Sequence, residues 1–120
     1  VPAPPTGATS DDYWEEVKPY PHESQLYFAS AFKATKYYLR TGDAGHDTGN
    51  KMPTSWVLQG SNNGEKWVEL DVENQQPPWG KLEKRIFNIK NPGKYNWYRF
   101  IFTDGSDPDS IRIYQLGVLP

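Results

Sequence analysis

The sequence predicts an all-β protein, a β-sandwich built from several short strands. Aromatic residues make up 15% of the 120 residues, whereas the helix-favouring residue Met occurs once. Eleven prolines and ten glycines interrupt the chain at short intervals, which suits short strands and disfavours long helices. A chain of this length can bury one hydrophobic core without disulfides or metal ions. We therefore expect a single domain, over residues 11–120.

Seven segments are rich in β-branched or aromatic residues and end near Gly, Pro, Asn or Asp, as strands do. They are residues 25–32, 36–41, 55–61, 66–71, 85–89, 96–103 and 111–119. The segment 96–103 is mostly apolar at both alternating sets of positions, which is typical of a central strand between two layers. The side chains expected in the core are Trp56, Leu58, Phe100 and Phe102.

The N-terminal part reads differently. Residues 1–10 are rich in Pro, Ala and Thr, which indicates an interdomain linker or a trimmed end of the chain. In residues 11–17, DDYWEEV, a preceding Ser10 and acidic residues in the first turn predict one or two helical turns. Pro19 and Pro21 would end that helix.

Charge and composition narrow the function. The net charge is −2 and the basic residues are scattered, which argues against a nucleic-acid partner. No run of apolar residues reaches the roughly 18 of a membrane span. The absence of Cys excludes disulfides and thiolate metal sites, and it is compatible with an exported protein.

The connections between the predicted strands fall into two groups. Links 33–35, 62–65 and 90–95 are short, whereas links 42–54, 72–84 and 104–110 are longer. If each strand crosses the sandwich once, successive links alternate between its two ends. All three long loops then lie at one end, joined there by residues 11–24. Long loops in compact domains are often functional, so this end is the expected binding face.

The segment 53–67, PTSWVLQGSNNGEKW, resembles the central hairpin of discoidin domains, also called coagulation factor V/VIII type C domains. This group includes family 32 carbohydrate-binding modules. Segments 38–43 and 67–71 fit the same pattern, as do 85–89, 95–100 and 111–116, so the likeness covers about residues 25–119. The resemblance implies a jelly-roll-like sandwich of the galactose-binding-domain type. It also implies an extracellular or cell-surface location within a larger multidomain protein.

The sequence departs from that family in its short N-terminal part and at one position near the last strand. Many relatives carry a Glu there that helps to hold a structural calcium ion, and the matching residue here is Gln115. An amide oxygen can still bind calcium. Further oxygen donors are Asp11, Asp12, Asp104, Asp107 and Asp109. A structural calcium near these residues and a merely solvated acidic loop both stay open.

Nothing in the sequence predicts an enzyme. A nucleophile needs a neighbouring base, yet the chain has no Cys, and its two histidines, His22 and His46, stand in different irregular segments. No Gly-rich phosphate loop and no pair of metal-spaced histidines occurs. We therefore expect a non-catalytic chain.

Carbohydrate binding fits better, because a sugar needs an aromatic face for its C–H groups and polar side chains for its hydroxyls. The long loops contain both kinds of group: His46, Asp47, Asn50 and Lys51 in one, Gln76 and Trp79 in the other. Family 32 modules that bind galactose-type sugars have their site in the same loops. Trp79 is either a stacking surface or a plug that closes the sandwich, whereas Trp14 and Tyr20 are expected to be such plugs. His46 either contacts a sugar hydroxyl or is simply solvated.

The expected function is therefore a carbohydrate-binding module that holds a larger secreted or surface protein near glycans. The alternative is a discoidin-like module that binds another protein or has a structural role in a larger surface or viral assembly. Membrane-binding relatives expose apolar and basic loop residues. These loops carry mainly Pro, Asp, Asn and Gln, which argues against a membrane partner.

Overall fold

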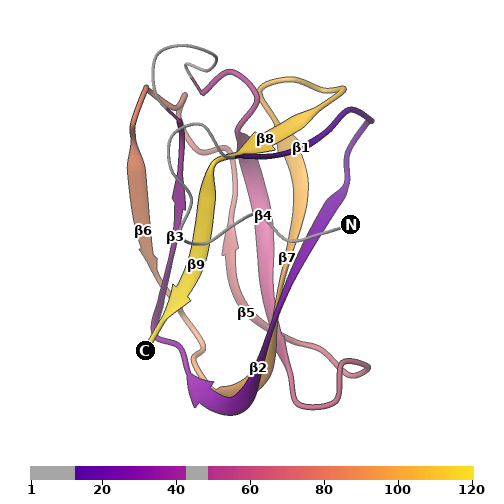
Figure 1. Ribbon diagram of the computed structural model, residues 1–120, viewed down its shortest axis with the longest axis vertical. Helices are drawn as coiled ribbons and strands as arrows, with labels where there is room; N and C mark the ends of the chain where they lie inside the picture. The colour runs from indigo at the N-terminus through magenta and orange to yellow at the C-terminus, as the bar shows by residue number, and fades with distance from the viewer. Residues whose placement is uncertain (1–12, 43–48) are drawn as a thin grey trace.

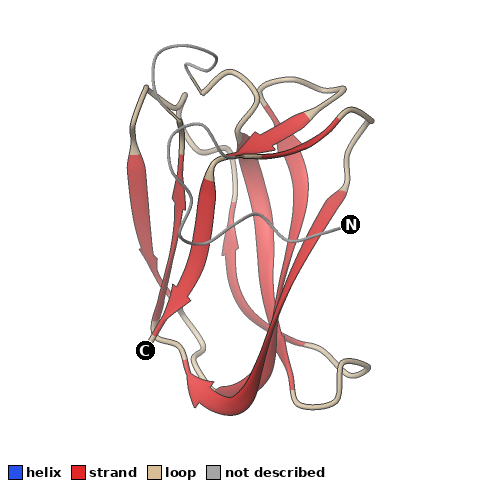
Figure 2. Ribbon diagram, viewed as in Figure 1, coloured by secondary structure: helices blue, strands red, loops and turns tan. Residues whose placement is uncertain are grey.

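The computed structural model describes residues 13–42 and 49–120, and every regular element among them is a β-strand (Figure 2). The strands are β1 (Trp14–Glu16), β2 (His22–Lys33), β3 (Lys36–Arg40), β4 (Pro53–Ser61), β5 (Val68–Glu73), β6 (Lys84–Asn88), β7 (Lys94–Gly105), β8 (Ile111–Ile113) and β9 (Gln115–Leu119). The predicted all-β class is confirmed. Within these residues no helix is long and apolar enough to cross a membrane.

The strands form two main sheets that face each other (Figure 1). One has four strands in the order β2-β7-β4-β5, and the other has three in the order β6-β3-β9. A small sheet of β1 and β8 lies across one end (Figure 1). All strand pairs are antiparallel, and strands distant in sequence lie side by side, which gives the predicted jelly-roll-like β-sandwich.

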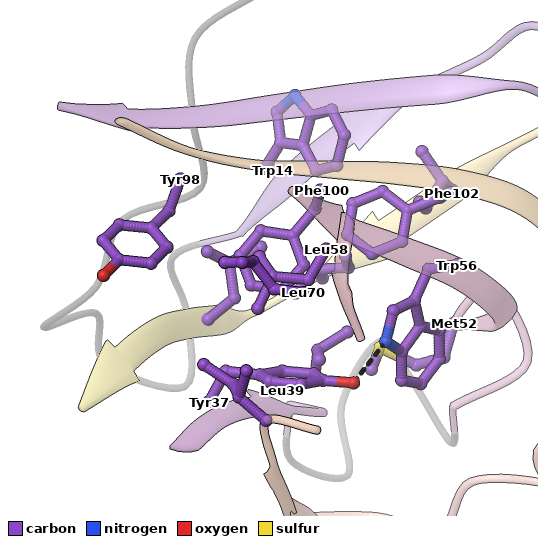
Figure 3. Packing of buried hydrophobic residues seen from close by; sticks show 14 of the residues in the cluster. Trp14, Tyr37, Leu39, Met52, Trp56, Leu58, Leu70, Tyr98, Phe100 and Phe102 are labelled. Carbon is purple, nitrogen blue, oxygen red and sulfur yellow. Dashed lines mark hydrogen bonds between the residues drawn. The ribbon is translucent and has the colours of Figure 1, made fainter. Parts of the chain in front are cut away.

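The core lies between the sheets and is dominated by aromatic side chains (Figure 3). Alternate residues of β7 and β4 point into it, because side chains of a strand alternate between its faces. The four residues expected in the core, Trp56, Leu58, Phe100 and Phe102, are all fully buried. From the opposite sheet come Tyr37, Leu39 and Leu116.

One buried polar chain crosses this apolar core. The indole nitrogen of Trp56 donates a 2.9 Å hydrogen bond to the hydroxyl oxygen of Tyr37 (Figure 3). That hydroxyl in turn donates a 2.6 Å bond to Oδ2 of Asp71 on β5. Burial, together with the bond to Asp71, raises the pKa of the Tyr37 hydroxyl far above its usual range. Tyr37 therefore stays protonated and links the two sheets through side chains.

The hairpin that carries the family resemblance is closed by side-chain hydrogen bonds. The hydroxyl oxygen of Ser61 accepts bonds from the backbone N–H groups of Asn63 and Gly64, at 3.2 and 2.9 Å. The side-chain oxygen of Asn63 accepts two more, from Glu65 and Lys66, at 2.8 and 2.9 Å. Gly64 has a φ of 72°, the left-handed conformation that glycine adopts without strain. The turn thus follows from the local sequence.

Two sequence-based predictions of secondary structure were wrong. The described part of the predicted helix 11–17 contains strand β1, in which Trp14 pairs with Ile113 of β8. Pairing buries the Trp14 side chain in the core, a gain that outweighs the local preference for a helical turn. The predicted strand 111–119 is interrupted at Tyr114, so that β8 pairs with β1 while β9 pairs with β3.

The grouping of the loops is confirmed. The described ends of the β3–β4 connection lie at the upper end in Figure 1, together with the connections β5–β6 and β7–β8 and the link between β1 and β2. The short turns β2–β3, β4–β5 and β6–β7 lie at the opposite end. The loop end thus gathers segments that are far apart in sequence, and the small β1–β8 sheet lies with them.

Candidate functional site

The loop 42–54 contributes four of the predicted site residues. His46 and Asp47 lie outside the described residues. In the described part of this loop, Gly49 has a φ of 87°, a backbone conformation that favours glycine. A Cβ at this position would come within 2.6 Å of both the Cβ and the carbonyl oxygen of Trp79. The backbone of one long loop therefore lies directly against the tryptophan of the other, and the two loops meet at one rim.

Trp79 itself is buried, with 5% of its surface exposed. Its indole nitrogen donates a 2.9 Å hydrogen bond to the carbonyl oxygen of Pro53, and the Arg85 guanidinium lies 3.9 Å from its ring centre. Gly49 covers it as well. This placement matches the plug alternative: Trp79 closes the end of the sandwich, and a sugar has no access to its ring faces.

Gln76 is also engaged within the protein. Its amide nitrogen donates to Glu73 at 2.9 Å, and its amide oxygen accepts from Arg85 at 3.3 Å. Arg85 also bonds Glu83 at 2.7 Å, and that hydrogen bond is the main cause that holds the pKa of Glu83 below its usual value. Gln76 therefore stabilises the loop around Trp79 through hydrogen bonds within the protein.

Four other side chains, of which Tyr13 is exposed and the rest are partly buried, form a cluster that we name the rim patch: Tyr13, Glu15, Lys51 and Arg112. Glu15 of β1 and Arg112 of β8 are paired across the small sheet, and their side chains meet at 2.8 Å. The ammonium of Lys51 lies 3.2 Å from the same carboxylate oxygen. The Arg112 guanidinium is 4.8 Å from the ring centre of Tyr13, which is 42% exposed.

The carboxylate of Glu15 organises this patch. Burial acts to raise its pKa, but the hydrogen bonds and positive charges of Lys51 and Arg112 outweigh burial, so the pKa lies below 4.5. Glu15 is therefore ionised at neutral pH and pairs with both cations, of which Arg112 also lies against the Tyr13 ring. Polar groups held in advance by such bonds bind a ligand with less loss of side-chain entropy.

Of the predicted site residues, Lys51 belongs to the rim patch, and the exposed Asn50 precedes it directly in the chain. Trp79 and Gln76 support the rim from beneath. The sequence-based prediction missed Tyr13, Glu15 and Arg112. A strand over residues 13–16 would have indicated the first two, because Trp14 faces inward and its neighbours must then face outward. The helical interpretation of this segment concealed that signal.

Trp14 and Tyr20 both pack with the core, as expected for plugs. His22 is buried, and its Nδ1 lies 2.7 Å from Oε1 of Glu16. This pair connects β1 to the start of β2. The His22 side chain is fully covered, whereas the Glu16 side chain keeps 14% of its surface exposed.

Gln115, the residue considered for calcium, does not fit that role. Its side-chain oxygen accepts a 3.0 Å hydrogen bond from Nε of Arg40, so a positive charge already lies beside the oxygen that would have to bind calcium. Across residues 13–42 and 49–120, no group of three or more His, Cys, Asp or Glu side chains could hold a metal ion. Asp11 and Asp12 lie outside the described residues.

Comparison with solved structures gives the fold a name. CpGH89CBM32-5 from Clostridium perfringens, solved in complex with GalNAc-β-1,3-galactose, superposes with a TM-score of 0.76 over 93% of this chain and 78% of its own. The two sequences are 13% identical. The chain has the fold of family 32 carbohydrate-binding modules. The predicted discoidin-like, galactose-binding-domain-like sandwich is thus confirmed.

Two further structures with this fold contain sugars. The family 32 module of C. perfringens NanJ, in complex with galactose, has a TM-score of 0.71 and 14% identity, over 92% of this chain and 77% of that one. Chitosan-binding module 2 of a chitosanase/glucanase from Paenibacillus sp. IK-5, in complex with chitotriose, has a TM-score of 0.72 and 9% identity, over 93% and 80%. At such low identities the likeness establishes the fold.

Sequence comparison adds one distant relative. A peptide-N(4)-(N-acetyl-β-glucosaminyl)asparagine amidase of Arabidopsis thaliana is 32% identical over 74 residues. The match covers 60% of this chain but 10% of the amidase. No protein-family model matches the sequence.

Proposed function

We propose that this chain is a non-catalytic carbohydrate-binding module of a secreted or surface protein, and that it binds a glycan at the loop end through the rim patch and the loop 42–54. One observation supports the proposal most strongly: an exposed aromatic ring, Tyr13, lies beside hydrogen-bonding groups that Glu15 holds in place. Structures with the same fold bind sugars, which supports the ligand class.

The chemistry of the rim patch suits a sugar ring. The Tyr13 ring offers an apolar face to sugar C–H groups. Arg112 and Lys51 donate hydrogen bonds, the Glu15 carboxylate accepts them, and the Asn50 amide can do both. Such groups discriminate between sugars, because a misplaced hydroxyl leaves a buried donor or acceptor unpaired at a cost of about 1–3 kcal/mol.

In this proposal His46 and Asp47 contact the sugar from the loop 42–54, as the sequence suggested. Trp79 and Gln76 act indirectly, by supporting the rim. The site is open to solvent, so we expect weak binding at one site and useful retention through several copies or sites on one protein. A module of this kind keeps its parent protein near glycans and needs no catalytic group.

The proposal is tested by isothermal titration with galactose, GalNAc-β-1,3-galactose and chitotriose. If one of these sugars binds, Tyr13→Ala is expected to lower the affinity for it by about tenfold or more. Ile86→Ala is the matched control, because Ile86 is 56% exposed on the outer face of the other sheet. Full binding by Tyr13→Ala would overturn the rim assignment. A module that binds no glycan on a broad array would favour the protein-interaction alternative.

A further inference from the structure

A second exposed surface lies outside the rim patch, on the outer face of the four-stranded sheet. Here side chains of β2, β7 and β4 stand in rows across the strands, because the register pairs their outward residues. We name this surface the sheet-face track. It comprises Glu23, Gln25 and Tyr27 of β2, Trp97, Arg99 and Ile101 of β7, and Gln59 of β4.

One end of the track is aromatic. Tyr27 and Trp97 are directly paired across β2 and β7, and their ring centres lie 4.6 Å apart at an angle of 50°. Tyr27 is 58% exposed, more than Tyr13 at the rim. Gly64 of the β4–β5 turn lies against the Trp97 ring, because a Cβ added at Gly64 would come within 3.3 Å of that ring. The turn therefore holds Trp97, and Trp97 in turn contacts the exposed tyrosine.

The middle of the track is a row of planar polar groups. Gln25, Arg99 and Gln59 are aligned across three strands. The Arg99 guanidinium lies 3.9 Å from the ring centre of Trp67 and donates a 2.8 Å hydrogen bond from Nε to Oε1 of Gln59. The ring contact and the hydrogen bond hold the Arg99 guanidinium in place beside the neighbouring amides.

The far end of the track is hollowed. A pocket of about 320 Å³ is lined by Glu16, Lys18, Pro21, His22, Glu23 and Ile101. Glu23 and Ile101 belong to the track and are paired across β2 and β7, so the pocket continues the same surface. From Glu23 to Tyr27 the track runs along about 13 Å of strand. That length exceeds one sugar ring and suits a short chain of them.

We propose that the sheet-face track binds an extended, uncharged glycan chain, as a second site separate from the rim patch. The inference rests on the proposed function, since it assumes that the module recognises carbohydrate. An exposed aromatic pair, a row of planar hydrogen-bonding groups and a hollow at one end match a chain of sugar rings. The aromatic pair then contacts the C–H faces of the glycan, and the planar polar side chains form hydrogen bonds with its hydroxyls.

Charge indicates the class of glycan. The single cation of the track, Arg99, lies 3.6 Å from the Glu23 carboxylate and above an aromatic ring, so it is already compensated. An acidic polysaccharide would gain little from this surface. An added peptide strand could not pair with β7 or β4, because both are already paired on both sides. An uncharged polyhydroxylated chain is the partner that this surface fits.

The test compares Tyr27→Ala, Tyr13→Ala and Ile86→Ala in affinity electrophoresis through gels that contain galactomannan, xyloglucan or hydroxyethyl cellulose. A polysaccharide that retards the wild type is expected to bind Tyr27→Ala about tenfold more weakly. Ile86→Ala should behave like the wild type. A second variant combines Gln25→Ala with Gln59→Ala. It should bind the same polysaccharide more weakly than the wild type, although its aromatic pair is intact.

The two sites fail in different ways. If Tyr27→Ala and the glutamine variant are both retarded like the wild type, the sheet-face track is overturned and the rim proposal is unaffected. If Tyr13→Ala keeps full binding to small sugars while Tyr27→Ala loses polysaccharide binding, the track stands and the rim assignment fails. If the wild type sediments as a dimer and Tyr27→Ala sediments as a monomer, the face is a self-association surface. That result would overturn the proposal that it binds a glycan. Retention by none of the three gels would overturn the track as well.

Discussion

The guanidinium of Arg85 lies 3.9 Å from the centre of the Trp79 ring and at the same time donates hydrogen bonds to the carbonyl oxygens of Pro77 and Pro78. One residue of β6 thereby holds both the loop that leads to Trp79 and the ring itself. Trp79, which the sequence suggested either as a sugar contact or as a plug, therefore supports the structure of the loop end.

Trp79→Ala should therefore mainly destabilise the fold. Removing a buried tryptophan leaves a cavity, at an expected cost of about 3–5 kcal/mol in the free energy of unfolding. Trp79→Phe should lose less and keep glycan binding, because it still fills most of the space. Urea unfolding and titration of both variants check this. A stable Trp79→Ala variant that has lost binding would instead make Trp79 a ligand contact.

Gly49→Ala should disturb the same contact from the other loop. The φ of 87° disfavours Ala, and the new Cβ would lie 2.6 Å from Trp79. We expect a loss of about 1–3 kcal/mol in unfolding free energy. Gly80→Ala is the matched control, since its Cβ would meet only Glu83 at 3.7 Å. Equal stabilities of the two variants would contradict the close approach.

Leu58→Ala tests the core of the sandwich. Leu58 is fully buried between the sheets, so its truncation should cost about 2–5 kcal/mol. Thermal or urea unfolding measures the change. A loss well under about 1 kcal/mol would place Leu58 outside the core.

Tyr37→Phe tests the buried polar chain. The substitution removes the hydroxyl that accepts from Trp56 and donates to Asp71, and it leaves both groups unpaired. We expect a cost of about 1–3 kcal/mol despite the almost unchanged packing. Denaturant unfolding of Tyr37→Phe, compared with Tyr27→Phe, whose side chain is 58% exposed, measures it. Equal stabilities of the two variants would show that the buried hydrogen bonds of Tyr37 contribute nothing to the free energy of unfolding.

Acid should weaken the rim patch through Glu15. Its pKa is lower in the folded chain than its ordinary value of 4.5, so its contribution to stability is present above that pH. The contribution is lost as the pH falls through the lowered, folded-state pKa. Glu15→Gln should thus be less stable at neutral pH and lose less stability in acid than the wild type. Urea unfolding across this range checks it, with the exposed Glu65→Gln as control.

Much of the fold could be predicted from local pattern. Alternation of side chains identified the inward residues of β4 and β7, and the spacing of Gly and Pro located the turns. The asymmetry of loop lengths correctly placed the long loops together at one end of the sandwich. These features depend on neighbours in the chain, so they can be read from it.

The N-terminal segment shows where such reasoning fails. An N-cap residue and acidic residues are local signals for a helix, yet strand β1 forms because Trp14 finds its partner on β8, nearly a hundred positions away. The same pairing brings Glu15 to Arg112 and turns Tyr13 outward. The error about one short segment therefore hid most of the rim patch.

The sequence by itself determined the all-β class, the aromatic core and the end of the sandwich at which the long loops gather, because hydrophobic alternation and turn residues act over a few positions. The tertiary structure alone decided which aromatic rings are exposed. Trp79 is enclosed by Arg85, Pro53 and Gly49, while Tyr13 and Tyr27 stay accessible. The accessible surface of a ring depends on the side chains that fold over it, and those come from distant parts of the chain.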